Sequence, residues 1–183
     1  MVAVLVILVV GAVLAVLLYN RLVGLAVQAD NAWADIDVQL KRRHDLIPNL
    51  VETVEGYATH ERESFEAVIQ ARNAAVAARG PAQQQRAEQS LAASLGQLFA
   101  LAEAYPELRA VERFNALQND LGEIEDALQS ARRYYNAVVR DLNTAILQFP
   151  SNLMATLCAI RAREFFELGD PSESAVPRVV FGD

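Results

Sequence analysis

A stripe of apolar residues that runs unbroken from Phe114 to Phe149 constrains the fold of this chain more than any other feature. Its members recur every three or four positions, at Phe114, Leu117, Leu121, Ile124, Leu128, Ala131, Tyr135, Val138, Leu142, Ala145 and Phe149. This spacing puts them all on one face of an α-helix, and holding it in phase over about five heptads is typical of a long helix packed lengthwise against others. Pro150 follows and predicts the end of that helix.

The rest of the chain also favours helices over strands. Ala, Leu, Glu, Gln and Arg are common, only eight Gly and six Pro occur, and no alternating β-branched run appears in the middle of the chain. The predicted fold class is therefore all-α. Besides the helix that starts near Phe114, the apolar spacing predicts helices over residues 22–79, 82–104 and 153–166, the first bent at Pro48 and ended before Gly80-Pro81.

The first twenty residues are almost entirely apolar and contain no charged side chain. At 1.5 Å per residue, the run from Val2 to Leu18 has about the length needed to cross a hydrocarbon core of roughly 30 Å. We predict a single transmembrane helix over residues 1–20, in contact with lipid. It is expected to be retained, because no basic region precedes the run and no small-x-small cleavage site follows it closely. Residues typical of a membrane interface come next: Tyr19, Asn20 and Arg21.

Arg21 also gives the only cue to orientation. It is the one basic side chain within about 15 to 20 residues of the end of the apolar run, and no Lys or Arg precedes that run. The positive-inside rule then places the large C-terminal part in the cytoplasm.

Several function classes are excluded by composition and spacing. The net charge of -7 argues against a nucleic-acid partner, because such partners select basic surfaces. His44 and His60 would lie about 24 Å apart along one helix, too far to share a metal ion. Neither a Ser, His and Asp arrangement nor a glycine-rich phosphate loop is present. We therefore expect no enzyme activity, no catalytic residue, no cofactor, no metal site and no small-molecule substrate.

One sharper alternative concerns His44, which follows the basic run Lys41-Arg42-Arg43. Their charge could attract a phosphoryl group, as in a histidine phosphotransfer module on a helical bundle. Adjacent charge more often reflects structural ion pairing, and the nearby Pro48 and the position of Arg43 on the apolar stripe disfavour this interpretation.

The apolar stripe between Trp33 and Ala58 predicts assembly. Arg43 occupies a stripe position where a hydrophobic residue is expected, and we predict that it pairs with an acid on a neighbouring helix. Because the predicted helices differ greatly in length, they overlap only in part, which would leave apolar positions without partners in one chain. The sequence thus predicts a homo-oligomer. The expected subunit contacts are Arg43, Ile47, Leu50 and Glu61, with Glu61 as a candidate acid from another subunit.

Several motifs in the same order resemble the LemA family of bacterial membrane-anchored helical proteins. They are IDVQLKRRHDLIPNLVETVEGYATHE, ARNAA, LFALAEAYPELRA, ARRYYNAVV, FPSNLMA and FFE, and they cover almost the whole chain. The resemblance implies a single-pass protein of the bacterial inner membrane. It also implies a single N-terminal membrane helix that carries a long-helix, four-helix-type bundle. Together with the residue patterns, this predicts a transmembrane helix over residues 1–20, an antiparallel bundle with coiled-coil-like packing over 21–168, and an extended tail over 169–183.

The same resemblance implies a role without established enzymatic activity. Some members of the family take part in building the membrane compartments of magnetosomes, and others are encoded near membrane proteases. The expected function is a membrane-anchored scaffold or adaptor that self-associates and organises or shapes the membrane. The alternative is a regulatory binding module for another membrane protein, such as a membrane protease, with histidine phosphotransfer as a distant third.

Overall fold

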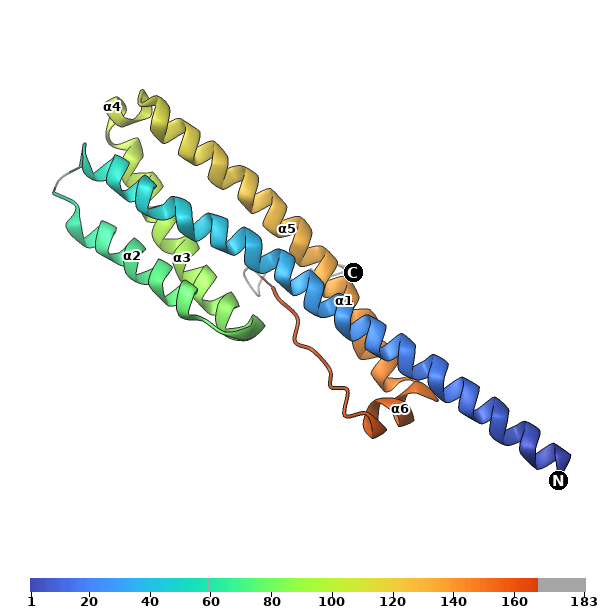
Figure 1. Cartoon of the computed structure of the whole chain (residues 1–183). Helices are drawn as coiled ribbons and strands as arrows, with labels where there is room; N and C mark the ends of the chain where they lie inside the picture. The colour runs from blue at the N-terminus through green and yellow to red at the C-terminus, as the bar shows by residue number, and fades with distance from the viewer. Residues whose placement is uncertain (59, 168–183) are drawn as a thin grey trace, which may run out of the picture.

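The computed structural model describes residues 1–58 and 60–167, and these form six helices (Figure 1). Two are long and run side by side over much of the molecule, and α2 and α3 cover the end of this pair that lies away from the N-terminus. The described residues contain no strand, which confirms the all-α prediction. The helices are α1 (Val2–Glu55), α2 (Arg62–Ala77), α3 (Gly80–Glu103), α4 (Pro106–Arg109), α5 (Glu112–Leu147) and α6 (Ser151–Leu157).

The long helices α1 and α5 pack antiparallel along their apolar stripes. Leu22 lies in a cluster with Ala145, and the rings of Trp33 and Tyr135 pack edge to face with centroids 5.3 Å apart. At the other end, α2 returns along α1 and α3 returns along α2, so that α1, α2, α3 and α5 form an antiparallel four-helix bundle. The predicted antiparallel bundle of long helices is confirmed.

The predicted single helix over residues 22–79 is wrong. The chain leaves the helix at Gly56 and reverses before α2 begins at Arg62. The reversal brings Phe65 and Val68 into the same core cluster as Val54, whereas a continuous helix would hold them in solvent. Burial of these large apolar side chains outweighs the local helical pattern.

The predicted helix over 153–166 is also wrong, because α6 ends at Leu157. Ala159 has a φ of 53°, in the left-handed region, and the Ile160 N–H donates to the Ala155 carbonyl at 2.9 Å, which closes the helix end. Residues 160–167, which we call the strap, then run extended back along α1 and α5 (Figure 1). The expected tail over 169–183 lies outside the described residues.

Two asparagines of α5 hold the strap. Asn143 donates from Nδ2 to the Arg163 carbonyl and accepts from the Arg163 N–H, both at 2.9 Å. Asn136, one heptad earlier on the same helix face, makes the same pair of 2.9 Å bonds with Phe166. The strap thereby buries Phe166 in the cluster around Tyr135 and covers the α1–α5 pair there.

Candidate functional site

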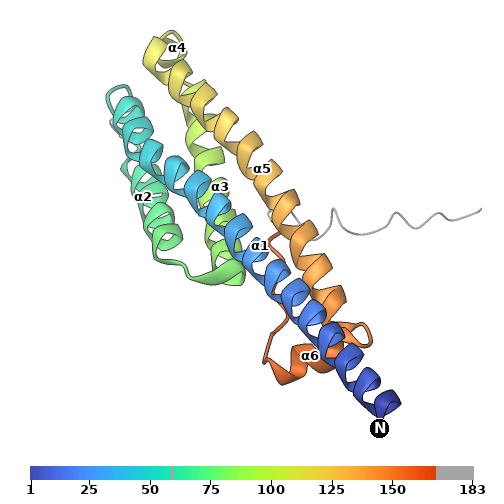
Figure 2. The same cartoon turned by 45° about the vertical axis from the view of Figure 1, so that its right-hand side comes forward.

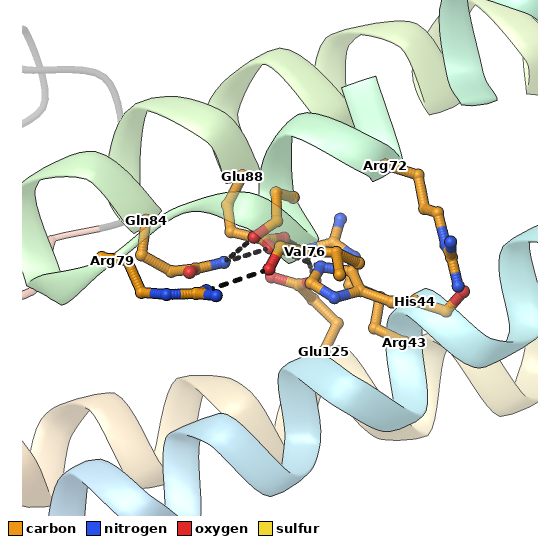
Figure 3. Close-up of polar contacts among 9 residues, drawn as sticks. Arg43, His44, Arg72, Val76, Arg79, Gln84, Glu88 and Glu125 are labelled. Carbon is orange, nitrogen blue, oxygen red and sulfur yellow. Dashed lines mark hydrogen bonds and ion pairs between the residues drawn. The ribbon is translucent and has the colours of Figure 1, made fainter. Parts of the chain in front are cut away.

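Helices α1, α3 and α5 bring a group of charged and polar side chains into the interior, which we call the buried polar cluster (Figure 3). Arg43 and His44 are consecutive on α1, so they point to neighbouring parts of its inner face. Gln84 and Glu88 are one helical turn apart on α3 and share a face. Glu125 reaches in from α5. The cluster therefore ties three helices together at mid-bundle.

Glu88 is the centre of the cluster. Its Oε1 lies 2.7 Å from His44 Nε2 and accepts from Gln84 Nε2 at 3.0 Å, while its Oε2 lies 3.3 Å from Arg43 Nη1. The Glu88 side chain is 0% exposed, whereas that of Glu125, 3.2 Å from the same Arg43 nitrogen, is 54% exposed. A buried carboxylate is tolerable only when several donors surround it, and Glu88 has three.

A second contact explains how α1 continues through a proline. Pro48 has no N–H, so the carbonyl of His44, four residues earlier, loses its helical donor. Arg72 of α2 supplies a replacement, because its Nε donates to that carbonyl at 3.1 Å. The predicted passage of the helix through Pro48 is confirmed, and a side chain from a different helix completes it.

The buried polar groups of this arrangement satisfy one another. Within the described part of the chain, every buried side-chain nitrogen or oxygen has a hydrogen-bond partner, and no set of three His, Cys, Asp or Glu residues is placed to hold a metal ion. His44 is buried and its Nε2 contacts a carboxylate, which would repel an incoming phosphoryl group. This geometry argues against the phosphotransfer alternative.

A polar pocket of about 410 Å³ lies beside the cluster, between α1 and the turn that joins α2 to α3. Charged groups of both signs line it, including Asp37, Lys41, Asp45, Arg72 and Arg79. Burial in its wall raises the pKa of Asp37 above the usual 3.8. Charges of both signs are therefore interspersed around this pocket.

A second pocket of about 390 Å³ begins on the other side of Trp33 and is partly walled by the strap. Burial raises the pKa of the Tyr135 hydroxyl above 10.0; Arg163 opposes this effect, and Glu164 and Asp30 add to it. The same hydroxyl donates to the Glu164 carbonyl at 2.9 Å. Tyr135 is thus part of the clamp that holds the strap.

The predicted contact residues lie inside a single chain. The ion pair between Arg43 and an acid on a neighbouring helix is confirmed, but the acid is Glu88 of the same chain, and Glu61 lies in the turn before α2. Ile47 and Leu50 are fully buried in the bundle core. A subunit contact at Arg43, Ile47, Leu50 and Glu61 stays a prediction. It was based on the expectation that these residues lack packing partners in their own chain, and Arg43, Ile47 and Leu50 have such partners.

Several residues of the site were not predicted from sequence. Gln84 and Glu88 precede Leu91 and Leu95 at helical spacing, so both are polar residues on an apolar stripe, the same signal that singled out Arg43. Arg72 and Asn143 carry no comparable signal, because each acts on the backbone of a segment distant in the sequence.

The chain matches a protein-family model and several curated proteins. The model of the LemA family matches residues 32–181. Magnetosome protein MamQ 2 and Magnetosome protein MamQ 1 of Paramagnetospirillum magneticum are each 26% identical to the chain over 175 residues, and Magnetosome protein MamQ of Magnetospirillum gryphiswaldense is 24% identical over 174. Each match covers 81% of this chain but only 64% of the relative, so the chain spans less than two thirds of the length of these proteins.

Proposed function

Since the chain belongs to the LemA family, we propose that it is a membrane-anchored helical scaffold whose copies associate side by side through α1. The observation that carries this proposal is α1 itself. It is a single helix of 54 residues that has an exposed apolar segment at one end and forms the wall of a packed bundle at the other.

Exposure of the first part of α1 supports membrane anchoring. Among the described residues, one helix is long and apolar enough to cross a bilayer, and none of the residues in its most apolar 18-residue window is buried. Exposing so large an apolar surface to water is energetically unfavourable. The length of the segment matches the thickness of a bilayer core, where that surface would contact lipid. The inner membrane and a cytoplasmic bundle are part of the proposal, as the positive-inside cue from Arg21 suggests.

Continuity of α1 supports a scaffold. The helix passes residue 20 without a break, so no flexible linker separates the proposed anchor from the bundle (Figure 2). The expected division of the chain into a transmembrane helix (1–20), a bundle (21–168) and a tail (169–183) stays a prediction. A rigid connection holds the bundle at a fixed angle to the membrane, which allows neighbouring copies to meet in register.

An exposed, uncharged stripe on α1 supports self-association. Its residues recur at alternating spacings of four and three, the coiled-coil period, and all of them are exposed. No side chain of another helix covers Gly24, the smallest of them. Two copies anchored in one membrane would present these stripes in parallel, with Asn31 as a polar residue able to set register. We call this set the α1 outer stripe: Asn20, Gly24, Val27, Asn31, Ala34 and Val38.

The size of the purified full-length protein in mild detergent tests the proposal. We expect an oligomer by light scattering, and we expect Val38→Asp to reduce its mass because the substitution buries an unpaired carboxylate between copies. Val76→Asp on α2 is the matched control, since the two valines are 55% and 48% exposed. It should leave the oligomer intact.

The opposite result would favour a regulatory binding module for another membrane protein. A monomer in mild detergent, with the same mass in the Val38→Asp variant, would remove the self-associating scaffold. An oligomer that both aspartate variants leave unchanged would instead place the contact outside the α1 outer stripe.

A further inference from the structure

The end of α5 and the whole of α6 form a hairpin that carries no charge. No Asp, Glu, Lys or Arg occurs from Leu142 to Ile160, and we call this segment the α5–α6 hairpin. Its large apolar side chains are not all turned inward. Four of them are between 63% and 80% exposed: Leu147, Phe149, Leu153 and Leu157.

The hairpin lies where α1 leaves the bundle toward its apolar end (Figures 1 and 2). Ala145 of α5 and Ala155 of α6 pack with Leu22 of α1 in one small apolar cluster. Leu22 is one helical turn past Leu18, the last residue of the apolar run, a rise of about 6 Å along the helix. The headgroup region on each side of a bilayer core is about as thick as that rise, so the hairpin is at the depth of the interface.

The charges around the hairpin fit the same placement. Exposed basic side chains flank it on three elements, with Arg21 on α1, Arg140 on α5 and Arg161 on the strap, and one exposed acid, Asp141, directly precedes it. Arginines at this level can reach lipid phosphates while the apolar residues between them enter the acyl region. The side chains facing α1 are small or apolar as well, so the exposed set is a second apolar face that the bundle core does not cover.

We propose that the α5–α6 hairpin is a second membrane-contacting element, embedded in the leaflet next to the anchor helix through Leu147, Phe149, Leu153 and Leu157. This inference rests on the proposed function, because it requires the segment from Val2 to Leu18 to lie in a bilayer. Its ligand is lipid. A hairpin that enters only one leaflet adds area to that leaflet alone and so provides a physical route to bending the membrane.

Fluorophore accessibility in vesicles tests this placement. The full-length protein carries a Cys158→Ser background and one new cysteine, labelled with an environment-sensitive fluorophore and reconstituted into vesicles of phosphatidylethanolamine and phosphatidylglycerol. The hairpin position is Leu157→Cys, with Leu153→Cys as a second variant should the first fail to fold. Leu8→Cys reports on the anchor, and Val76→Cys is an exposed position on the bundle. Quenchers are a nitroxide-bearing lipid and aqueous iodide.

We expect the hairpin label to be quenched by the nitroxide lipid and protected from iodide, as the Leu8 label is, while the Val76 label shows the reverse. A hairpin label that behaves like the Val76 label, or that is protected from both quenchers, overturns the inference, and the proposed function survives if the Leu8 label still senses lipid. A Leu8 label quenched by iodide alone overturns both.

Discussion

Replacing Glu88 by alanine is expected to destabilise the bundle more than any single surface change. Removal of one partner from a buried ion pair costs about 3–5 kcal/mol, because the remaining charge is left in the interior without compensation. Here Glu88→Ala removes the acceptor for three groups at once: Arg43 at 3.3 Å, His44 at 2.7 Å and Gln84 at 3.0 Å. Arg43 keeps Glu125 at 3.2 Å, which holds the loss toward the lower end of that range.

Thermal unfolding of the full-length protein in detergent, followed by circular dichroism, measures the loss. At about 2–4 °C per kcal/mol for a domain of this size, Glu88→Ala should lower Tm by roughly 6–20 °C. Glu125→Ala is the matched control, because it removes a carboxylate from the same arginine at a half-exposed position. It should cost less than about 1 kcal/mol.

A triple variant separates the burial of charge from the packing of the site. When Arg43, His44 and Glu88 are all replaced by apolar residues of similar size, no unpaired charge remains in the interior, because Glu125, which loses Arg43, is 54% exposed. Gln84 keeps the Ala75 carbonyl at 3.1 Å. The triple variant should therefore be more stable than Glu88→Ala. Equal losses in Glu88→Ala and Glu125→Ala, or a triple variant less stable than Glu88→Ala, would refute this reasoning.

Three further predictions concern the backbone contacts and the strap. Arg72→Ala should lower the free energy of unfolding by about 1–3 kcal/mol, and by less in a Pro48→Ala background, where the helix regains its own N–H donor. Chemical denaturation of the four proteins measures the coupling between the two positions, and equal losses in both backgrounds would contradict it. Asn143→Ala should remove two hydrogen bonds, about 1–3 kcal/mol in total, and speed amide exchange in the strap, while unchanged exchange there would contradict the clamp. Because burial raises the pKa of Tyr135 above 10.0, its contribution to stability is complete below pH 10.0 and is lost as pH rises through the higher folded pKa. The protection factors of the strap amides, which correct for base-catalysed exchange, should therefore fall in that alkaline window in the native protein but not in Tyr135→Phe.

Local patterns were enough to predict the fold class and two of the helices. The stripe from Phe114 to Ala145 became the buried face of α5, and the helix predicted over residues 82–104 became α3, because each pattern coincides with a face that packs in the bundle. Phe149, the last predicted member of the stripe, lies beyond the end of α5 at Leu147 and is 80% exposed. The break after Glu55 could not be read in this way. The apolar spacing continues to Tyr57, and the reversal depends on the burial of Phe65 against a distant part of the chain.

The same limit applies to the candidate site. Arg43 was found because a charge on an apolar stripe requires a partner, and the partner on a neighbouring helix exists. Its identity as Glu88 of the same chain depends on how α3 folds back against α1, which no local pattern encodes. The strap escaped prediction for a related reason, since Asn136 and Asn143 look like ordinary solvated residues until the backbone they hold is in place.

Disulfide cross-linking in native membranes tests the central claim, parallel association through α1, most directly. Ala34→Cys in a Cys158→Ser background puts the only thiol of each copy on the α1 outer stripe, and Val76→Cys in the same background puts it on an equally accessible part of α2. The account predicts that mild oxidation converts the Ala34→Cys protein to a covalent dimer and leaves the Val76→Cys protein monomeric. Equal cross-linking of both variants, or none at Ala34→Cys, would contradict it.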